Sequence, residues 1–264
     1  ILMSENILEI NNLSKYFGGL AAVSDCSLNV KRGTITGIIG PNGSGKTTLF
    51  NLIAGNLKSS SGVVTFDEEN ITDVPSYELF SKGLLRTFQI AHEFSNLSVL
   101  ENLMMVPGNQ SGEKLMTALL KPKLVAEEEA TIKEKAKEVV DFLNLGHLSN
   151  ELAGNLSGGQ KKLLELGRTM MVDAKLVLLD EVGAGVNRTL LKDLGTAIEK
   201  LNKEKGYTFC MIEHDMDFIG RLCDPVIVMA EGSVLFEGSV EDAKKDEKVI
   251  ESYLGRGSKL KETN

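Results

Sequence analysis

Short apolar runs alternate with segments of helical periodicity along most of the chain. Thr34–Gly40 is short, β-branched and ends in glycine, which predicts a strand buried on both faces. Lys46–Ala54 has helical periodicity and Gly55 supplies its stop. The same pattern predicts strands at Val63–Phe66, Leu84–Phe88, Lys175–Leu179, Tyr207–Ile212 and Pro225–Ala230, and helices at Val125–Leu145, Gly158–Val172, Thr189–Glu204 and Asp215–Leu222. This alternation predicts an α/β fold with a mainly parallel sheet.

The middle of the chain interrupts the alternation. Between Ile90 and about Asp173 the sequence contains no convincing strand, which predicts a helical subdomain inserted into the α/β core. Within it, Pro107–Pro122 begins and ends with proline and contains glycine and serine, so we expect a loop there. Lys259–Asn264 is expected to be a frayed tail.

Composition and charge narrow the class of protein. The 264 residues are 42% hydrophobic and 25% charged, which is typical of soluble globular proteins. The longest apolar runs are far shorter than the roughly 18 to 20 residues that cross a bilayer, and three scattered cysteines indicate a reduced, cytosolic compartment. The net charge of −8 argues against general nucleic-acid binding.

One motif points to a small polyanion. The residues GPNGSGKT at 40–47 match G-x-x-x-x-G-K-[ST] and stand between a predicted strand and a predicted helix. Glycines allow backbone N–H groups to face phosphate oxygens, and a helix N-terminus adds partial positive charge. Lys46 would reach the β- and γ-phosphates, and the Thr47 hydroxyl would ligate Mg²⁺. We therefore predict a site for a nucleoside triphosphate and Mg²⁺ formed by Gly40, Pro41, Asn42, Gly43, Ser44, Gly45, Lys46, Thr47 and Thr48.

Two carboxylates complete the expected chemistry. Leu176–Leu179 builds a buried strand, and Asp180 and Glu181 follow at its carboxyl end. Asp180 suits a contact to the metal, directly or through water. Glu181 suits a general base that polarises the attacking water.

A second anion site is predicted far along the chain. Leu156 is followed by Ser157, Gly158, Gly159 and Gln160, directly before a predicted helix. The free N–H groups of that helix start and the serine hydroxyl would bind phosphate. Because the first loop already holds the phosphates of one nucleotide, this surface would serve a nucleotide held by another chain.

Together these motifs resemble the ATP-binding cassette (ABC) ATPases, and the resemblance runs from about Ile7 to Gly255. It implies a single domain over residues 5–255, followed by a tail at 256–264. Its RecA-like P-loop NTPase core would occupy 5–89 and 174–255 and carry an antiparallel β subdomain. The helical subdomain with the signature motif would occupy 90–173.

The resemblance also implies roles for single residues. Gln89 matches the Q-loop glutamine, which contacts the metal and couples to the membrane subunit, and His214 matches the switch histidine at the γ-phosphate. The implied catalytic residues are thus Glu181, His214, Lys46 and Gln89, and the implied metal contacts are Thr47, Gln89 and Asp180.

An aromatic residue near the start of the chain matches the family's adenine contact. Phe17, before two glycines, would stack on the adenine ring, with Tyr16 as the other candidate for that role. The alternative is that Phe17 belongs to the apolar core.

Two positions depart from the family pattern. Val182 stands where proline usually follows the catalytic glutamate, which affects the stiffness of the loop more than its chemistry. Asn187 stands where the D-loop usually has aspartate, which keeps hydrogen bonding but loses charge and so could alter communication across a dimer.

The finer resemblance is to the ATP-binding subunits of branched-chain amino-acid importers. It is carried by Lys15–Val23, Gly83–Gln89, Ser98–Leu103, Ile212–Met216 and Lys248–Gly255. The implied partners are a second ATPase subunit, identical or different, packed head to tail, multispanning permease subunits and, indirectly, a solute-binding protein. The implied location is the cytoplasmic face of the inner (plasma) membrane, reached through the permease. Nucleic acid is not an expected partner.

In the implied mechanism, ATP is sandwiched between Lys46 of one chain and Ser157 of the other, and closure of the pair pulls on a permease docked near 89–102. Four apolar residues either line that dock or form the core of the helical subdomain: Ile90, Phe94, Leu97 and Val99. Alternative functions are a lipopolysaccharide-export ATPase, a soluble cassette acting on DNA or ribosomes, and a regulatory cassette that does not hydrolyse ATP.

Overall fold

The computed structural model describes residues 4–87, 93–108, 110–113 and 115–258. The chain divides into two compact units. The first comprises Ile1–Arg86, Lys175–Gly183 and Glu199–Asn264, and the second comprises Thr87–Ala174 and Ala184–Ile198. The segment 184–198, which the sequence pattern places with the core, thus groups with the helical residues. The expected tail at 259–264 lies outside the described residues.

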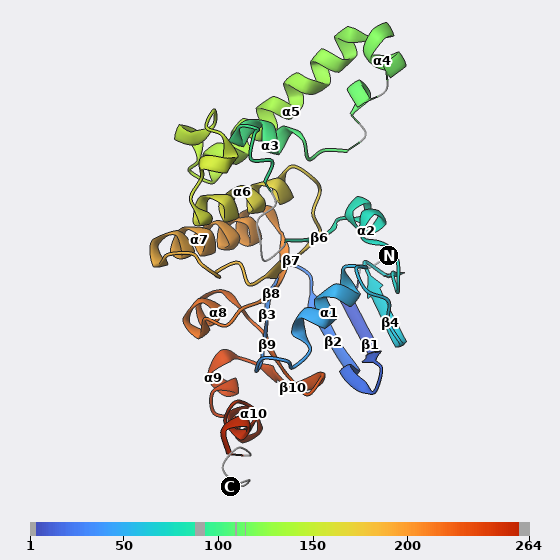
Figure 1. The fold of residues 1–264 in the computed structure, drawn as a ribbon, viewed down its shortest axis with the longest axis vertical. Coiled ribbons are helices and arrows are strands. Elements are labelled where there is room, and N and C mark those ends of the chain that lie inside the picture. The colour runs from blue at the N-terminus through green and yellow to red at the C-terminus, as the bar shows by residue number, and fades with distance from the viewer. Residues whose placement is uncertain (1–3, 88–92, 109, 114, 259–264) are drawn as a thin grey trace. The chain divides into compact units, whose positions relative to one another are not determined.

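The first unit is built on a six-stranded sheet in the order β10-β9-β3-β8-β7-β6 (Figure 1). The first five strands in chain order are parallel, as expected, and β10 pairs antiparallel with β9. Every residue of β3, β7 and β8 is buried, which explains their continuous apolar sequences. The strands are β3 (Ile35–Ile39), β6 (Leu84–Arg86), β7 (Leu176–Asp180), β8 (Thr208–Ile212), β9 (Val226–Ala230) and β10 (Ser233–Gly238).

A second, antiparallel sheet of the same unit has the order β2-β1-β4-β5. The long hairpin β1–β2 turns at Gly18 and Gly19 (Figure 1). Apolar residues of this sheet share one core with Ile38 of β3 and with Leu49 and Phe50 of the following helix. The antiparallel subdomain implied by the family resemblance is therefore present. Its strands are β1 (Asn6–Phe17), β2 (Leu20–Lys31), β4 (Ser61–Phe66) and β5 (Glu69–Asn70).

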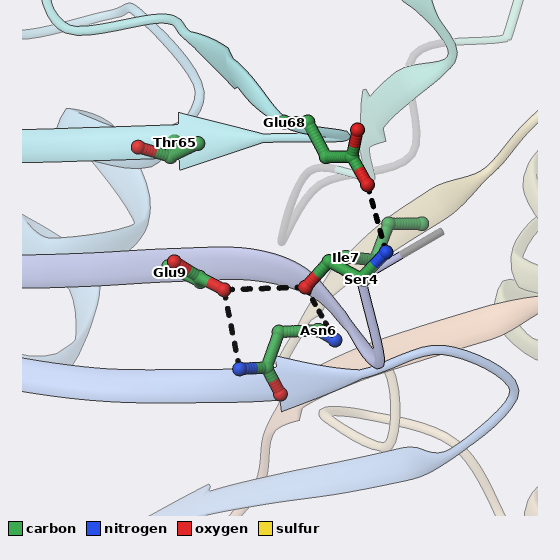
Figure 2. A pocket seen from close by; sticks show the side chains of 6 residues that line it. All are labelled: Ser4, Asn6, Ile7, Glu9, Thr65 and Glu68. Atoms are coloured by element: carbon green, nitrogen blue, oxygen red, sulfur yellow. Dashed lines mark hydrogen bonds between the residues drawn. The ribbon is translucent and has the colours of Figure 1, made fainter. Parts of the chain in front are cut away.

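A pocket of about 380 Å³ opens beside the start of β1. Figure 2 shows its polar groups bonded to one another: Glu9 Oε1 accepts from Asn6 Nδ2 at 3.2 Å, and Glu68 Oε1 accepts from the Ser4 amide at 2.7 Å. None of the residues predicted to bind nucleotide lines it. Since the polar groups of Ser4, Asn6, Glu9 and Glu68 already bond to one another, we assign the pocket no role in the chemistry.

The helices of the first unit cover these sheets. They are α1 (Lys46–Ile53), α2 (Ser76–Lys82), α8 (Met216–Leu222), α9 (Val240–Ala243) and α10 (Glu247–Ser258). The sequence pattern predicts α1 and α8 within a residue or two, but it predicts neither α10 nor the edge strand β10. β10 has no fully buried residue, so its sequence lacks the apolar run that marks the inner strands.

The second unit is helical, and no strand occurs among its described residues. Its main helices α3, α5 and α6 contact one another. Gly167 of α6 permits this approach, because a Cβ there would lie 2.7 Å from Leu143 Cδ1. The elements are α3 (Val99–Met104), η1 (Ser111–Glu113), α4 (Leu115–Leu120), α5 (Pro122–Phe142), η2 (Gly146–Leu148), η3 (Ala153–Asn155) and α6 (Gly158–Met170), while α7 (Arg188–Lys205) begins in this unit and continues into the first.

The expectation of a loop at Pro107–Pro122 is wrong for part of that segment. Ser111–Glu113 forms a 3₁₀ turn and Leu115–Leu120 forms the helix α4. The residues LMTALL favour a helix intrinsically, and the flanking prolines and glycines obscure that signal in a longer window.

Across the described residues, no helix is both long enough and apolar enough to cross a bilayer.

The buried centre of the parallel sheet offers a test of the fold. Phe209 of β8 is fully buried, and its ring centroid lies 6.0 Å from that of Tyr207. We expect Phe209→Ala to lower the free energy of unfolding by about 3 to 5 kcal/mol, because it leaves a cavity in a close-packed core. Tyr77, with 74% of its surface exposed, is the control: Tyr77→Ala should cost less than about 0.5 kcal/mol. Denaturant titration of both variants measures the difference, and equal costs would contradict this placement of β8.

Candidate nucleotide site

The loop between β3 and α1 has a backbone that only glycine can form at two points. Gly40 has φ 147° and Gly45 has φ 99°. A Cβ at Gly40 would lie 2.1 Å from the Met229 carbonyl oxygen, and one at Gly45 would lie 2.4 Å from that of Ala22. The two glycines are therefore fixed by close backbone approach as well as by conformation. The resulting cradle ends at the start of α1, where the first N–H groups lack helical partners.

Lys46, the first residue of α1, folds back over this loop. Its Nζ donates to the carbonyl oxygens of Gly40 at 2.8 Å and Pro41 at 3.1 Å. Burial lowers the pKa of Lys46, while the charges of Glu181 and Asp180 oppose that shift. The ammonium therefore lies at the cradle with two carboxylates in electrostatic range. Thr47 follows and is exposed, which leaves its hydroxyl accessible.

Asp180 ends β7 as predicted, and it is buried. Its Oδ2 accepts a hydrogen bond from Arg86 Nη2 at 2.6 Å, and both side chains are at least nine-tenths buried. Arg86 ends the neighbouring strand β6, and its Nη1 donates to Asn51 Oδ1 of α1 at 2.6 Å. The acid expected to contact a metal is thus held by a charged partner that none of the sequence motifs indicates.

Glu181 and His214 meet although 33 residues separate them. In the parallel register Asp180 pairs with Ile212, so the residues that follow the two strands, Glu181 after β7 and Glu213 and His214 after β8, start from the same edge of the sheet. The Glu181 amide donates to the Ile212 carbonyl at 2.9 Å, and His214 Nε2 lies 2.9 Å from Glu181 Oε1. Glu181 has φ 49°, a left-handed backbone rare for this residue type and frequent at functional sites.

A neighbouring acid, Glu213, fixes the loop that follows Glu181. It is 5% exposed, its Oε1 accepts from the Gly183 amide at 2.7 Å, and burial raises its pKa. This bond pins the backbone directly after Val182, where the family usually has proline. The bond thus restrains the loop close to the position where proline would restrain it through a fixed φ.

Asn187, the second departure, directly precedes α7. Its Oδ1 accepts a hydrogen bond from the Leu190 amide at 3.0 Å, which is the contact of a helix N-cap. Asparagine and aspartate are about equally good in that position. Replacing the usual aspartate therefore preserves the helix start while removing one negative charge.

Phe17 lies at the end of β1, beside the turn of the β1–β2 hairpin. Its side chain is 49% exposed and Tyr16 is 50% exposed, so the alternative of a core aromatic is wrong. Lys15 Nζ lies 5.4 Å from the centroid of the Phe17 ring. The ring thus has a face accessible for stacking, and its contact with adenine stays a prediction.

In the second unit, Ser157 caps α6. The Ser157 hydroxyl accepts from the Gln160 amide, and Gln160 Oε1 accepts from the Ser157 amide, which together form a capping box. A Cβ at Gly159 would lie 2.4 Å from Leu190 Cδ1, so this glycine is required for packing against α7. The signature sequence therefore shapes a helix start, and its role as an anion site stays a prediction.

Of the remaining predicted residues, some lie outside the described part of the chain and the others differ in burial. Gln89 and Ile90 lie outside the described residues. Val99 is fully buried and belongs to the helical core, whereas Phe94 is 49% exposed and carries the Arg168 guanidinium 5.7 Å from its ring centroid. Val99 therefore belongs to the core of the helical subdomain, while a docking role for the exposed Phe94 stays a prediction.

Comparison with known proteins places this geometry in a family. The ABC transporter family model matches residues 23–184. A relative from Archaeoglobus fulgidus, named a probable branched-chain amino acid transport ATP-binding protein LivG, is 44% identical over 94% of this chain and 95% of its own length. BraF of Pseudomonas aeruginosa, named a high-affinity branched-chain amino acid transport ATP-binding protein, is 35% identical over 96% of this chain and 99% of its own length.

Solved structures agree. A nucleotide-free ATP-binding cassette of an ABC transporter is 39% identical, with a TM-score of 0.80 over 94% of this chain and 98% of its own length. The ADP conformation of an ATP-binding cassette of an ABC transporter is also 39% identical, with a TM-score of 0.81 over 96% of this chain and all of its own length. The chain therefore belongs to the ABC transporter family, as a nucleotide-binding, ATP-hydrolysing subunit.

Proposed function

We propose that this chain powers the uptake of branched-chain amino acids, or related small polar solutes, through a separate membrane permease. The observation that carries the proposal is similarity over nearly the full length to proteins named for branched-chain amino acid transport. The lipopolysaccharide-export and soluble alternatives are not favoured by these relatives. Glu181 and His214 are in contact, which argues against a cassette that has lost hydrolysis.

The residues of the site fit ATP with Mg²⁺. Gly40 and Gly45 allow the loop to take the conformation of the cradle, since a Cβ at either would clash with a neighbouring backbone carbonyl oxygen, and Lys46 supplies a cation beside the loop. Asp180 and Thr47 supply the carboxylate and hydroxyl oxygens that Mg²⁺ prefers, and Gln89 is proposed as a further contact. Bound Mg²⁺ would neutralise charge that develops on the phosphates. The remaining cradle contacts are assigned to Gly40, Pro41, Asn42, Gly43, Ser44, Gly45 and Thr48, and the adenine contact to Phe17.

The protein's own groups would then divide the work of hydrolysis. Lys46 binds the β- and γ-phosphates in place of the loop carbonyls. Glu181 orients and polarises the attacking water as general base. His214, hydrogen-bonded to Glu181 Oε1, holds that carboxylate in position and contacts the γ-phosphate.

Completion of the site requires a second ATPase subunit. Ser157, Gly158, Gly159 and Gln160 start a helix in the second unit and form a separate anion-binding surface. We propose that this surface meets the γ-phosphate held by a partner, identical or different, packed head to tail. Multispanning permease subunits and a solute-binding protein complete the transporter, which places this chain at the cytoplasmic face of the inner membrane.

The role of the cradle lysine is testable in the isolated chain. We expect Lys46→Ala to weaken ATP binding by at least about 100-fold, because it removes charge-assisted hydrogen bonds to phosphate. Titration with a fluorescent ATP analogue measures the affinity. Lys58→Ala, at an exposed lysine of the same region, is the control and should bind normally. An unchanged affinity in Lys46→Ala would overturn the cradle assignment.

The general base is tested together with transport. We expect Glu181→Gln to lower the hydrolysis rate by at least about 100-fold while ATP still binds, since glutamine cannot accept the proton. Size-exclusion chromatography should then show a dimer that depends on ATP.

In proteoliposomes with the cognate permease and binding protein, wild-type protein should drive leucine uptake and the variant should not. Glu78→Gln, on the exposed surface of α2, is the control. Wild-type turnover in Glu181→Gln would exclude Glu181 as base, and absence of leucine uptake with wild-type protein would refute the proposed solute.

A further inference from the structure

Arg86 joins three elements at the heart of the first unit. Its Nη2 donates to Asp180 Oδ2 at the end of β7, and its Nη1 donates to Asn51 Oδ1 on α1, each at 2.6 Å. The guanidinium carbon lies 6.0 Å from the centroid of the Phe50 ring. A planar guanidinium presents its two terminal nitrogens in a fixed fork, so both bonds hold at once in a single orientation.

The bridge that Arg86 forms between Asp180 and Asn51 connects two segments proposed to bind Mg²⁺. Asn51 lies four residues after Thr47 on α1, and residues at that spacing share one face of a helix. Arg86 therefore ties the Asp180 carboxylate to the helix face that carries the Thr47 hydroxyl. These are two of the groups proposed to bind Mg²⁺, and they come from segments 133 residues apart in sequence.

The bridge engages one oxygen of the carboxylate. Among side chains that the structure describes, the Asp180 carboxylate has Arg86 as its hydrogen-bond partner, through Oδ2. Arg86 therefore fixes the orientation of the Asp180 carboxylate through Oδ2 and forms no bond to Oδ1. A buried ion pair of this kind is weak support for stability, because desolvation offsets the attraction, but it fixes orientation well.

We propose that Arg86 is a positioning residue for the metal site: by holding Asp180 Oδ2 against Asn51, it sets the carboxylate where its other oxygen and the Thr47 hydroxyl bind one Mg²⁺. The proposal rests on the assignment of Asp180 and Thr47 to the metal under the proposed function. Groups that orient metal ligands in this way contribute about 10- to 100-fold to metal affinity.

The test uses the full chain and two substitutions of the bridge. Arg86→Lys keeps the positive charge but replaces the fork by one ammonium, which cannot reproduce both bonds in the same geometry. Asn51→Ala removes one anchor of the fork and no charge. In both, we expect Mn²⁺ binding with ADP, measured by electron paramagnetic resonance, to weaken by about 10-fold. The Mg²⁺ concentration for half-maximal ATPase should rise equally, while the rate at saturating Mg²⁺ should return to within about twofold of wild type.

The controls separate orientation from general damage. Arg32→Lys alters another arginine–aspartate pair of the same unit, Arg32 with Asp67, and should leave Mn²⁺ affinity unchanged. If Arg86→Lys does not fold, Asn51→Ala carries the test alone. Unchanged or tighter Mn²⁺ binding in the folded bridge variants would overturn the proposal, since tighter binding would make Arg86 a competitor of the metal. Asp180→Asn should bind Mn²⁺ far more weakly; normal binding there would instead overturn the metal assignment itself.

Discussion

The parallel register of β3, β8 and β7 is the constraint on which the site depends. Parallel strands present their carboxyl ends at one edge of a sheet, and here three buried strands do so side by side. The cradle follows β3, Glu213 and His214 follow β8, and Asp180 ends β7 with Glu181 directly after it. Because Asp180 pairs with Ile212, a slip of one residue would separate Glu181 from His214. The pairing of Asp180 with Ile212 and the bond from the Glu181 amide to the Ile212 carbonyl oxygen fix this register at the edge where the two acids lie.

Two features that are each unfavourable in free energy are concentrated at this edge of the sheet: strained backbone conformations and buried charges. The cradle glycines and Glu181 adopt backbone conformations that are unfavourable or impossible for most residues, and Lys46, Asp180, Arg86 and Glu213 bring charge into the interior. Each charge has a partner that offsets its desolvation: a loop carbonyl for Lys46, Arg86 for Asp180, a backbone amide for Glu213. Such concentrations of strain and buried charge are typical of sites preorganised for chemistry.

The two departures from the family pattern have structural counterparts. After Glu181, where this chain has Val182 and no proline, the Gly183 amide donates a hydrogen bond to the Glu213 carboxyl group. Asn187 caps α7 as an aspartate would. The contact between Glu181 and His214 is present together with both changes. Asn187 lacks the negative charge that the family usually has at this position, so the surface offered to a partner subunit differs in charge there.

The sequence by itself determined the α/β alternation, the inner strands, the cradle and the two acids after β7. It did so because buried strands are continuous apolar runs and because phosphate binding needs glycine, lysine and threonine at fixed local spacing. It gave no bounds for β1, β2, α2, α3, α9, α10 or β10, and it expected a loop where α4 lies. β10 has no fully buried residue and α4 is flanked by proline and glycine, so neither leaves a clear period. Only the tertiary structure decided that Arg86 and Asn51 hold Asp180, that Glu213 fixes the loop after Glu181, and that Gly159 is a packing residue. These roles depend on contacts between segments distant in sequence, which no local pattern records.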